Sequence, residues 1–365
     1  MRVEEKAAVT ITESDPAGVS TESSRLSVRG YRAQDDFAWD TFVQAHPHGS
    51  PFHLTAWKKS IEETFGFRPV YLLAEDANGI RGVLPLFEVV NFLSGKALIS
   101  SPFAVYGGVL ADSVTVRDSL YHHANELGEQ RGVGYVEYRN SYANQVSGAA
   151  NVLRYVTFTK EIVPAQNPLQ LVPKKTRNLI RKALKSPYSS RRTADMRSFF
   201  DLYSRNLRRL GTPCFPQRHF AALLKNFGLM ADVSEVLLED KIVAASMNFY
   251  FQDQMHTYYA ASDPRFWAQS PNNFMYYDHL CWAARNGYRV FDFGRSKRDT
   301  GTFEFKRHWT EDMRELPYEI KLIRRKELPN FSPSNGRFQA AIEIWKRLPL
   351  AVTRALGPRL VRLFP

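Results

Sequence analysis

Cysteine is scarce in this chain of 365 residues, which contains only Cys214 and Cys281. Two cysteines so far apart form neither a disulfide framework nor a zinc knuckle, so we expect a protein of a reducing compartment. Long apolar runs are missing too, because the richest stretch, 83–111, is interrupted by Glu88, Lys96, prolines and glycines. A bilayer-spanning helix needs about 20 apolar residues, so we expect none.

Signal-peptide features and several catalytic motifs are also missing. The first 24 residues have no apolar core of the required length and are rich in Ser, Thr and Glu. We therefore expect residues 1–25 to form a disordered tail and the protein to be cytoplasmic. The patterns GxxxxGK(S/T), HExxH, GxSxG and CxxC do not occur, which argues against kinases, zinc enzymes and hydrolases.

The composition that is present is that of a folded protein with an uneven charge. Apolar residues make up 44% and aromatic residues 13% of the chain, which excludes a mostly disordered protein. The formal net charge is +12; residues 174–218 carry +11 and residues 321–365 carry +8, so the remainder carries 12 − 19 = −7. Two basic segments on a mildly acidic body indicate anionic partners at defined places.

Each basic segment has helical periodicity and leaves two interpretations open. In 174–186 the apolar residues form a narrow stripe, and Lys and Arg cover the rest of the helix. These cations either form a solvated surface or bind the phosphates of RNA, of a nucleotide- or lipid-linked sugar or of a coenzyme. The candidates for these contacts are Lys174, Lys175 and Arg181. In 337–364, Phe338, Ile342, Trp345 and Leu348 form an apolar side that lies on an anionic membrane or docks on the protein itself.

Helix and strand patterns alternate and then repeat in the same order, which indicates an α/β (α+β) fold built by duplication. Residues 132–138 align with 287–293 at an offset of 155, and the hairpin over 70–89 resembles that over 234–251 at an offset near 164. We expect two tandem domains, 26–165 and 166–330, each with a mixed central sheet flanked by helices, followed by a basic amphipathic tail, 331–365.

The densest group of polar and aromatic residues lies in 291–309, at the end of an apolar strand. Asp292 is the single carboxylate of that strand, and we expect it either to pair with Arg295 or to act as a base. Lys306 could stabilise an oxyanion or a phosphate. The remaining candidates for substrate binding in this segment are Arg295, Ser296, Lys297, Gly301, Phe303, Phe305 and Trp309.

Two further segments contribute candidates for substrate binding. Asn272 and Asn273 lie at the start of an expected helix, where free backbone N–H groups bind anions, although capping alone also explains these residues. Tyr106 belongs to the segment 101–108, which follows an expected strand of the first domain.

The chain resembles the FemAB-like members of the GNAT superfamily over about residues 26–324. The resemblance lies in FHLTAWKKSIEETFGFRPVYLLAE, SSPFAVYGGVLAD, VPKKTRNLIRKALK, NLRRLGTPCFP, NNFMYYDHL and FDFGRSK…TGTFEFKRHW. More narrowly, the chain resembles the FemAB-related proteins of exosortase (XrtA)/PEP-CTERM systems, which are linked to exopolysaccharide.

The resemblance implies two GNAT-like domains and transfer of an acyl or aminoacyl group to an amine, with no tightly bound cofactor or metal. In FemAB-like enzymes a Phe-Lys pair lies at the reaction centre, and Phe305-Lys306 matches it, with Lys306 as the oxyanion or leaving-group stabiliser. The pyrophosphate-loop pattern (R/Q)xxGx(G/A) before a helix does not occur. The donor therefore stays open between acyl-CoA, acyl carrier protein and aminoacyl-tRNA.

Our hypothesis from sequence is an N-acyltransferase that acts on an amine of an anionic cell-envelope or exopolysaccharide precursor. The first alternative is an aminoacyl-tRNA-dependent ligase of the peptidoglycan type, in which 174–185 binds tRNA. The second alternative is a non-catalytic adaptor that uses 337–364 to lie on the inner membrane.

Overall fold

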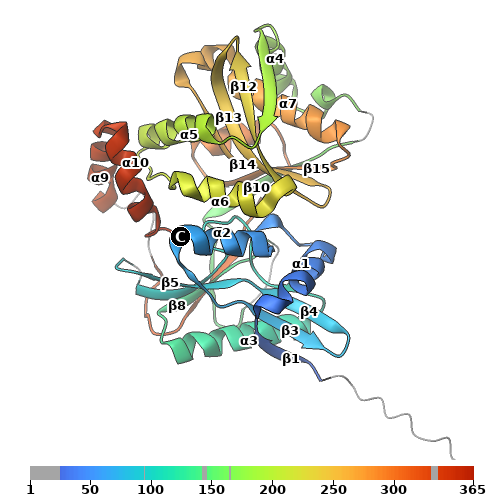
Figure 1. Cartoon of the computed structure of the whole chain (residues 1–365), viewed down its shortest axis with the longest axis vertical. Helices are drawn as coiled ribbons and strands as arrows, with labels where there is room; N and C mark the ends of the chain where they lie inside the picture. The colour runs from blue at the N-terminus through green and yellow to red at the C-terminus, as the bar shows by residue number, and fades with distance from the viewer. Residues whose placement is uncertain (1–24, 94, 142–145, 164–165, 330–335) are drawn as a thin grey trace, which may run out of the picture.

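The computed structural model describes residues 25–93, 95–141, 146–163, 166–329 and 336–365. The tail expected over residues 1–25 therefore lies almost wholly outside the described residues. The two halves of the chain lie one above the other in Figure 1. Each half has a mixed sheet flanked by helices, which confirms the predicted fold class.

The first half contains two sheets with strand orders β1-β3-β4-β7 and β2-β5-β6-β8-β17-β9. Its strands are β1 (Ser27–Gly30), β2 (Arg68–Pro69), β3 (Leu72–Asp76), β4 (Gly79–Leu84), β5 (Leu86–Asn91), β6 (Gly95–Ser100), β7 (Leu110–Ala111), β8 (Tyr135–Arg139) and β9 (Ala150–Val152). Its helices are α1 (Asp36–Ala45), α2 (Thr55–Phe65) and α3 (Val114–Arg131).

The second half contains one sheet with the order β11-β12-β13-β14-β15-β10-β16. Its strands are β10 (Tyr155–Glu161), β11 (Tyr188–Thr193), β12 (Ala231–Leu238), β13 (Lys241–Phe251), β14 (Gln254–Ser262), β15 (Val290–Lys297) and β16 (Met313–Glu315), followed by β17 (Tyr318–Leu322). The helices are α4 (Lys174–Ala183), α5 (Arg197–Leu210), α6 (Gln217–Phe227), α7 (Pro271–Arg285), α8 (Gly301–Arg307), α9 (Gly336–Arg347) and α10 (Leu350–Val361).

A strand–helix–strand unit with a parallel strand pair occurs in both halves. In the first half β6 and β8 are parallel and are joined through α3, and in the second half β14 and β15 are parallel and are joined through α7. The strands β8 and β15 begin at Tyr135 and Val290, which differ by the offset of 155 seen in the sequence. The aligned segments therefore occupy the same place in both units.

The two halves exchange one strand each. The strand β10 precedes the expected boundary at residues 165 and 166, but it pairs with β15 and β16 of the second sheet. The strand β17 lies beyond most of the second half, but it pairs with β8 and β9 of the first. The domain boundary between residues 165 and 166 remains a prediction. The strand β10, before this boundary, belongs to the second sheet, and β17, after it, belongs to a sheet of the first half.

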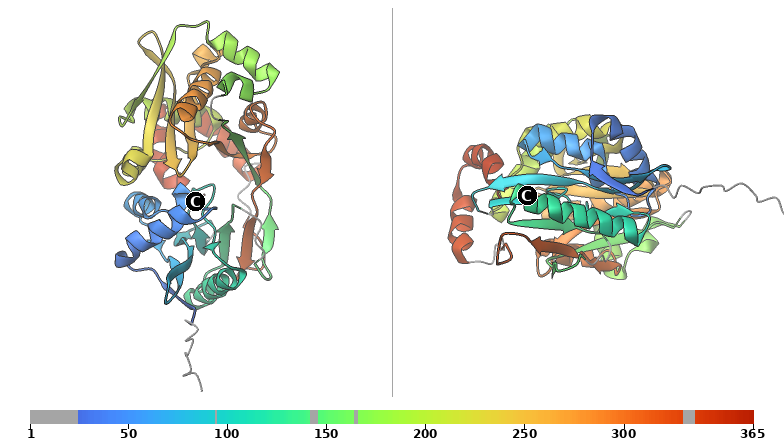
Figure 2. Two further views of the ribbon diagram at one scale, coloured as in Figure 1. Left: turned by 90° about the vertical axis from the view of Figure 1, so that its right-hand side faces the viewer. Right: turned by 90° about the horizontal axis from the view of Figure 1, so that it is seen from below.

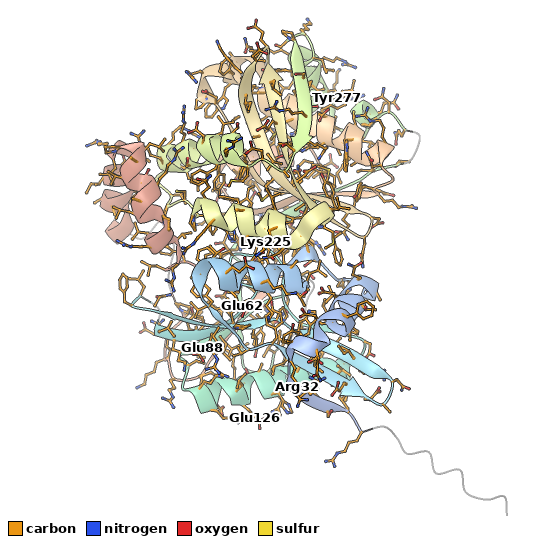
Figure 3. All side chains as sticks on the ribbon, viewed as in Figure 1. Arg32, Glu62, Glu88, Glu126, Lys225 and Tyr277 are labelled. Carbon is orange, nitrogen blue, oxygen red and sulfur yellow. The ribbon has the colours of Figure 1, made fainter. Side chains whose placement is uncertain are left out.

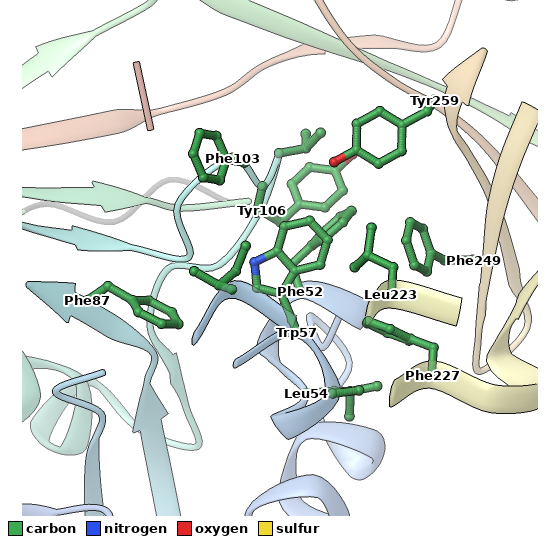
Figure 4. Packing of buried hydrophobic residues seen from close by; sticks show 14 of the residues in the cluster. Phe52, Leu54, Trp57, Phe87, Phe103, Tyr106, Leu223, Phe227, Phe249 and Tyr259 are labelled. Carbon is green, nitrogen blue, oxygen red and sulfur yellow. The ribbon is translucent and has the colours of Figure 1, made fainter. Parts of the chain in front are cut away.

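The core is continuous across the two halves. The helices α2 and α6 face each other at their junction (Figure 1), and Lys225 of α6 forms an ion pair with Glu63 of α2 at 3.3 Å near the labelled Glu62 (Figure 3). Beneath them the ring of Phe249 lies 6.2 Å from that of Phe52 and 6.3 Å from that of Trp57 (Figure 4). This apolar contact fixes the halves relative to each other, because separating them would expose large aromatic surfaces.

The C-terminal segment forms two helices that dock on α5 (Figures 1 and 2). Trp345 of α9 is buried, and Ile342 lies so close to Gly211 that a Cβ there would come within 2.4 Å of it. Arg354 of α10 donates to Asp201 and Ser204 of α5. Trp345 and Ile342 of the predicted apolar side thus pack on the protein, Leu348 is partly exposed, and the Phe338 side chain lies outside the described side chains.

No helix within the described ranges is long and apolar enough to cross a membrane.

Candidate functional site

The candidate site lies where the parallel strands β14 and β15 separate. Their ladder covers three residue pairs and ends at His256 and Asp292. Just beyond it, β15 has a bulge against β10, because Phe158 pairs with Gly294 while the adjacent Thr159 pairs with Asp292. Gly294 has φ +71°, a left-handed conformation that glycine adopts at little cost. The bulge turns the carbonyl groups of Gly294 and Arg295 toward the helix α8, which follows β15.

Asp292 is buried at the junction of the two halves and accepts hydrogen bonds from both. The Tyr106 hydroxyl of the first half donates to its Oδ2 at 2.7 Å, and the Gly294 N–H donates to its Oδ1 at 2.5 Å. The Nδ1 atom of His256 lies 3.4 Å from Oδ2. Because the Tyr106 proton points to the carboxylate, the Thr157 hydroxyl, 2.7 Å away, donates to Tyr106.

These contacts decide the protonation state of Asp292. Burial alone would raise the pKa of its carboxyl, but His256, Tyr106 and the Gly294 amide together hold that pKa below its usual value. The carboxylate also raises the pKa of Tyr106, whose burial acts in the same direction. Asp292 is therefore ionised at neutral pH and Tyr106 is a neutral donor.

Lys306 is a buried lysine with an unusual environment. Its Nζ donates to the carbonyl oxygens of Gly294 at 3.0 Å and Arg295 at 2.9 Å. Burial lowers its pKa to about 7; the charge of Arg295 adds to this effect and that of Asp292 opposes it. Two hydrogens of Nζ are donated to these carbonyl groups. The third position carries an N–H when the lysine is protonated and a lone pair when it is neutral, and the two states are close in free energy at neutral pH.

Arg295 does not pair with Asp292 as the sequence suggested. Its Nη1 donates to the Ala104 carbonyl at 3.0 Å and to the Tyr318 hydroxyl at 3.1 Å, and its guanidinium lies over the Tyr155 ring at 4.6 Å. The expected pairing was wrong because three positions along an extended strand separate the two side chains, and each finds partners in the first half. Arg295 therefore fixes the segment 101–108, which carries Tyr106.

Aromatic side chains pack around α8, and their predicted role in substrate binding stays a prediction. Phe303 packs against Phe158 of β10 with ring centroids 5.5 Å apart, and the half-buried Phe305 packs against Tyr276 of α7 at 5.1 Å. Trp309 is fully buried against the same Tyr276. The Thr300 hydroxyl caps α8 by accepting from the Phe303 N–H at 3.3 Å, which sets the helix in the orientation that brings Lys306 to β15.

Several predicted residues lie around this centre without joining it. Ser296 is buried, and its hydroxyl has no hydrogen-bond partner in the described part of the chain. The others are Lys297, exposed at the end of β15; Gly301, exposed at the start of α8; Asn272 and Asn273, in the first turn of α7; and Lys174, Lys175 and Arg181, exposed on α4. The helix α4 is close to α8, since Lys175 Nζ is 3.5 Å from His308 Nε2 and Thr176 donates to the His308 carbonyl.

Three residues near Asp292 were missed in the sequence. They are His256 and Thr157, which complete the buried polar cluster, and Arg314 of β16, which lies over the Tyr106 ring at 5.8 Å. A histidine inside the apolar strand 254–262 was the available signal for His256. Nothing local marks Thr157 or Arg314, because each reaches the site through strand pairing with a distant segment.

Comparison with known proteins places this site in a described domain family. Residues 173–307 match the family model described as acetyltransferase (GNAT) domain, and this segment contains Asp292 and Lys306. No curated protein sequence matches the chain significantly.

Solved structures with a similar fold cover most of the chain. FemX matches with a TM-score of 0.66 and 15% identity over 82% of this chain and 98% of its own. A tandem GNAT protein from the clavulanic acid biosynthesis pathway matches with a TM-score of 0.51 and 10% identity over 82% of this chain and 98% of its own. L-PGS from Bacillus licheniformis matches with a TM-score of 0.52 and 13% identity over 86% of this chain and 96% of its own.

These likenesses establish a GNAT-like fold in the FemX and tandem-GNAT arrangement. The domain match indicates an acyltransferase, with Lys306 and Asp292 inside the matched segment.

Proposed function

We propose that the protein is an N-acyltransferase that transfers an acyl or aminoacyl group to an amine of an anionic cell-envelope or exopolysaccharide precursor. The observation that carries the proposal is Lys306, buried at the point where β14 and β15 separate, with its pKa lowered to about 7. Such a group stabilises negative charge or moves a proton at neutral pH. Its neighbour Phe305 completes the Phe-Lys pair that the resemblance places at the reaction centre.

The reaction forms one C–N bond and breaks one C–S or C–O bond. A neutral amine of the acceptor attacks the donor carbonyl, and negative charge develops on the carbonyl oxygen. The third N–H of protonated Lys306 stabilises that oxygen or protonates the leaving thiolate or alkoxide. The proton lost by the amine passes to a carboxylate or to solvent, and Asp292 is an ionised carboxylate whose charge acts on Lys306.

We propose acyl-CoA or acyl carrier protein as the donor, in keeping with the acetyltransferase domain match. Exposed cations on α4, next to α8, complement the phosphates that both donors carry. We further propose that the protein serves an exosortase/PEP-CTERM system and works at the cytoplasmic side of the inner membrane.

A second candidate is an aminoacyl-tRNA-dependent ligase of the peptidoglycan type. The likeness to FemX favours it, as does the run of exposed Lys and Arg on α4, which also suits an RNA backbone. If this candidate holds, charged tRNA binds in a salt-dependent manner, and charge reversal at Lys174, Lys175 and Arg181 weakens that binding. The adaptor alternative predicts that no donor of either class binds.

The test combines donor binding with turnover. Native mass spectrometry of the full chain against acyl-CoAs, acyl carrier proteins and charged tRNAs identifies the donor class, and amino sugars then serve as acceptors in an assay of leaving-group release. We expect Lys306→Ala to retain the donor and to lower turnover about 10²–10³-fold. The matched control is Lys241→Ala, which removes an exposed lysine of β13.

The outcomes separate the candidates. Retention of a thioester donor together with normal turnover by a folded Lys306→Ala variant would remove Lys306 from the mechanism. Retention of charged tRNA alone would move the function to aminoacyl transfer.

A further inference from the structure

The end of the β5–β6 hairpin exposes large apolar side chains. Phe92 is 82% exposed, and Val90 and Leu93 beside it are exposed as well. An aromatic side chain exposed to this extent buries little apolar area and so contributes little to the stability of the fold. A set of such side chains in one place marks an interaction surface.

The helices α9 and α10 also turn apolar side chains outward. On α9, Ile344 is 62% exposed and is followed one turn later by the exposed Arg347. On α10, Val352, Leu356 and Arg359 lie at positions i, i+4 and i+7, share one face and are all exposed. Both helices contact α5, and both also expose apolar side chains followed by an arginine, Ile344 with Arg347 on α9 and Val352 and Leu356 with Arg359 on α10.

These two exposed regions lie on the same side of the molecule. The views agree that the β5–β6 hairpin and the α9–α10 pair both end at the left edge of the molecule (Figure 1 and the right panel of Figure 2). We call this surface, made of the hairpin end and the outward sides of α9 and α10, the hairpin–tail face.

Exposed basic residues lie on or beside the elements of the hairpin–tail face, namely Arg324, Arg347 and Arg359. Lys96 pairs with Val90 next to the turn of the hairpin. The Gly134 N–H donates to the Lys96 carbonyl at 2.7 Å and the Gly134 carbonyl accepts from the Arg324 N–H at 3.2 Å, so Arg324 lies near the same end of the hairpin. The carboxylate of Glu88 is already paired with Lys96 and Arg131, and that of Glu343 with Lys346. Residues 321–365 carry a balance of +8.

We propose that the hairpin–tail face binds the surface of an anionic lipid bilayer. Apolar side chains at a hairpin end and along two short helices enter the boundary between headgroups and acyl chains, while flanking Lys and Arg contact anionic headgroups. A second copy of the chain is the less suitable occupant, because a symmetric contact would bring two basic faces together. The binding is peripheral, and it is separate from the packing of Trp345, which faces the protein.

The test is sedimentation of the full chain with vesicles of phosphatidylcholine, with and without phosphatidylglycerol. We expect binding to the anionic vesicles that weakens with salt. Phe92→Ser with Leu93→Ser should lower the partition constant at least about tenfold, and Arg347→Glu with Arg359→Glu by roughly fivefold or more per charge. The matched controls are Phe37→Ser, which alters an equally exposed phenylalanine on α1, and Lys241→Glu with Arg285→Glu.

Each outcome decides the proposal. Loss of binding in the hairpin and tail variants but not in the controls supports it. Absence of vesicle binding by the unaltered chain overturns it, and so does equal loss in the controls. Self-association in solution that Phe92→Ser abolishes would assign the face to a second copy instead. Because no turnover is measured, these results are independent of the proposed transfer reaction.

Discussion

Replacing Lys306 with methionine removes a buried charge and keeps most of the side-chain volume. In the unfolded chain the lysine has its usual pKa of 10.5, and in the folded protein burial lowers that pKa to about 7. Between these two values the unfolded chain binds one more proton than the folded chain, so this lysine makes the protein more stable as the pH rises. Below about pH 7 the charged form is buried and the full cost is present.

The size of the cost follows from the pKa. One pKa unit corresponds to about 1.4 kcal/mol, so burying the charged form costs about 5 kcal/mol. Methionine removes this cost but leaves the carbonyl groups of Gly294 and Arg295 without their donor, at about 1–2 kcal/mol each. We therefore expect Lys306→Met to be more stable than the unaltered chain by about 1–3 kcal/mol below pH 7, and less stable by about 2–4 kcal/mol above pH 10.5.

The assay is equilibrium urea unfolding of both proteins at several pH values from about 6 to 10, with the stability difference taken at each pH. That difference should fall by about 1.4 kcal/mol per pH unit across the interval and change sign within it. Lys241→Met serves as the control, and its difference should stay flat, because an exposed lysine keeps its hydration on folding. A flat difference for Lys306→Met as well would refute the argument that Lys306 is a desolvated base.

Two further predictions concern the junction between the halves. Tyr106→Phe removes a donor that helps to keep the pKa of Asp292 low. We therefore expect the acid limb of the pH–rate profile to move to higher pH and the free energy of unfolding to fall by about 1.5–3 kcal/mol. An unchanged profile would place Asp292 outside the rate-determining step. Phe249→Ala leaves a cavity between the rings of Phe52 and Trp57. We expect the free energy of unfolding to fall by about 3–5 kcal/mol and thermal unfolding to remain one cooperative transition. Two separate transitions would mean that the halves unfold independently.

The order of elements was predictable because it depends on local patterns. The segments 132–138 and 287–293, which align in the sequence, lead into the equivalent strands β8 and β15, and the helix expected at Asn272 and Asn273 is α7, which begins at Pro271. The exchange of β10 and β17 was not predictable in this way. Strand pairing is decided by register and burial against distant partners, and neither strand carries a local signal that names its sheet.

The same limit applies to the site. Asp292 and Lys306 stood out because a lone carboxylate on an apolar strand and a lysine among aromatic residues are local irregularities. The lowered pKa of Lys306, by contrast, depends on its burial beneath β15 and, to a smaller extent, on the nearby charge of Arg295. The pairing of Asp292 with Arg295, one of two alternatives from the sequence, does not form for the same reason, since Tyr106 bonds Asp292 and the Ala104 carbonyl bonds Arg295, both from a distant segment.

The strand exchange explains why a duplicated chain has its ionised carboxylate at the junction. The exchanged strand β10 pairs with β15 at the bulge and brings Thr157 to Tyr106, while β17 carries Tyr318, whose hydroxyl donates to the Val105 carbonyl at 2.6 Å. The segment that holds Tyr106 is thus fixed by one residue from each of the two exchanged strands. Neither half can form the Asp292 environment alone, so separating them would leave a buried carboxylate without the donors that keep it ionised.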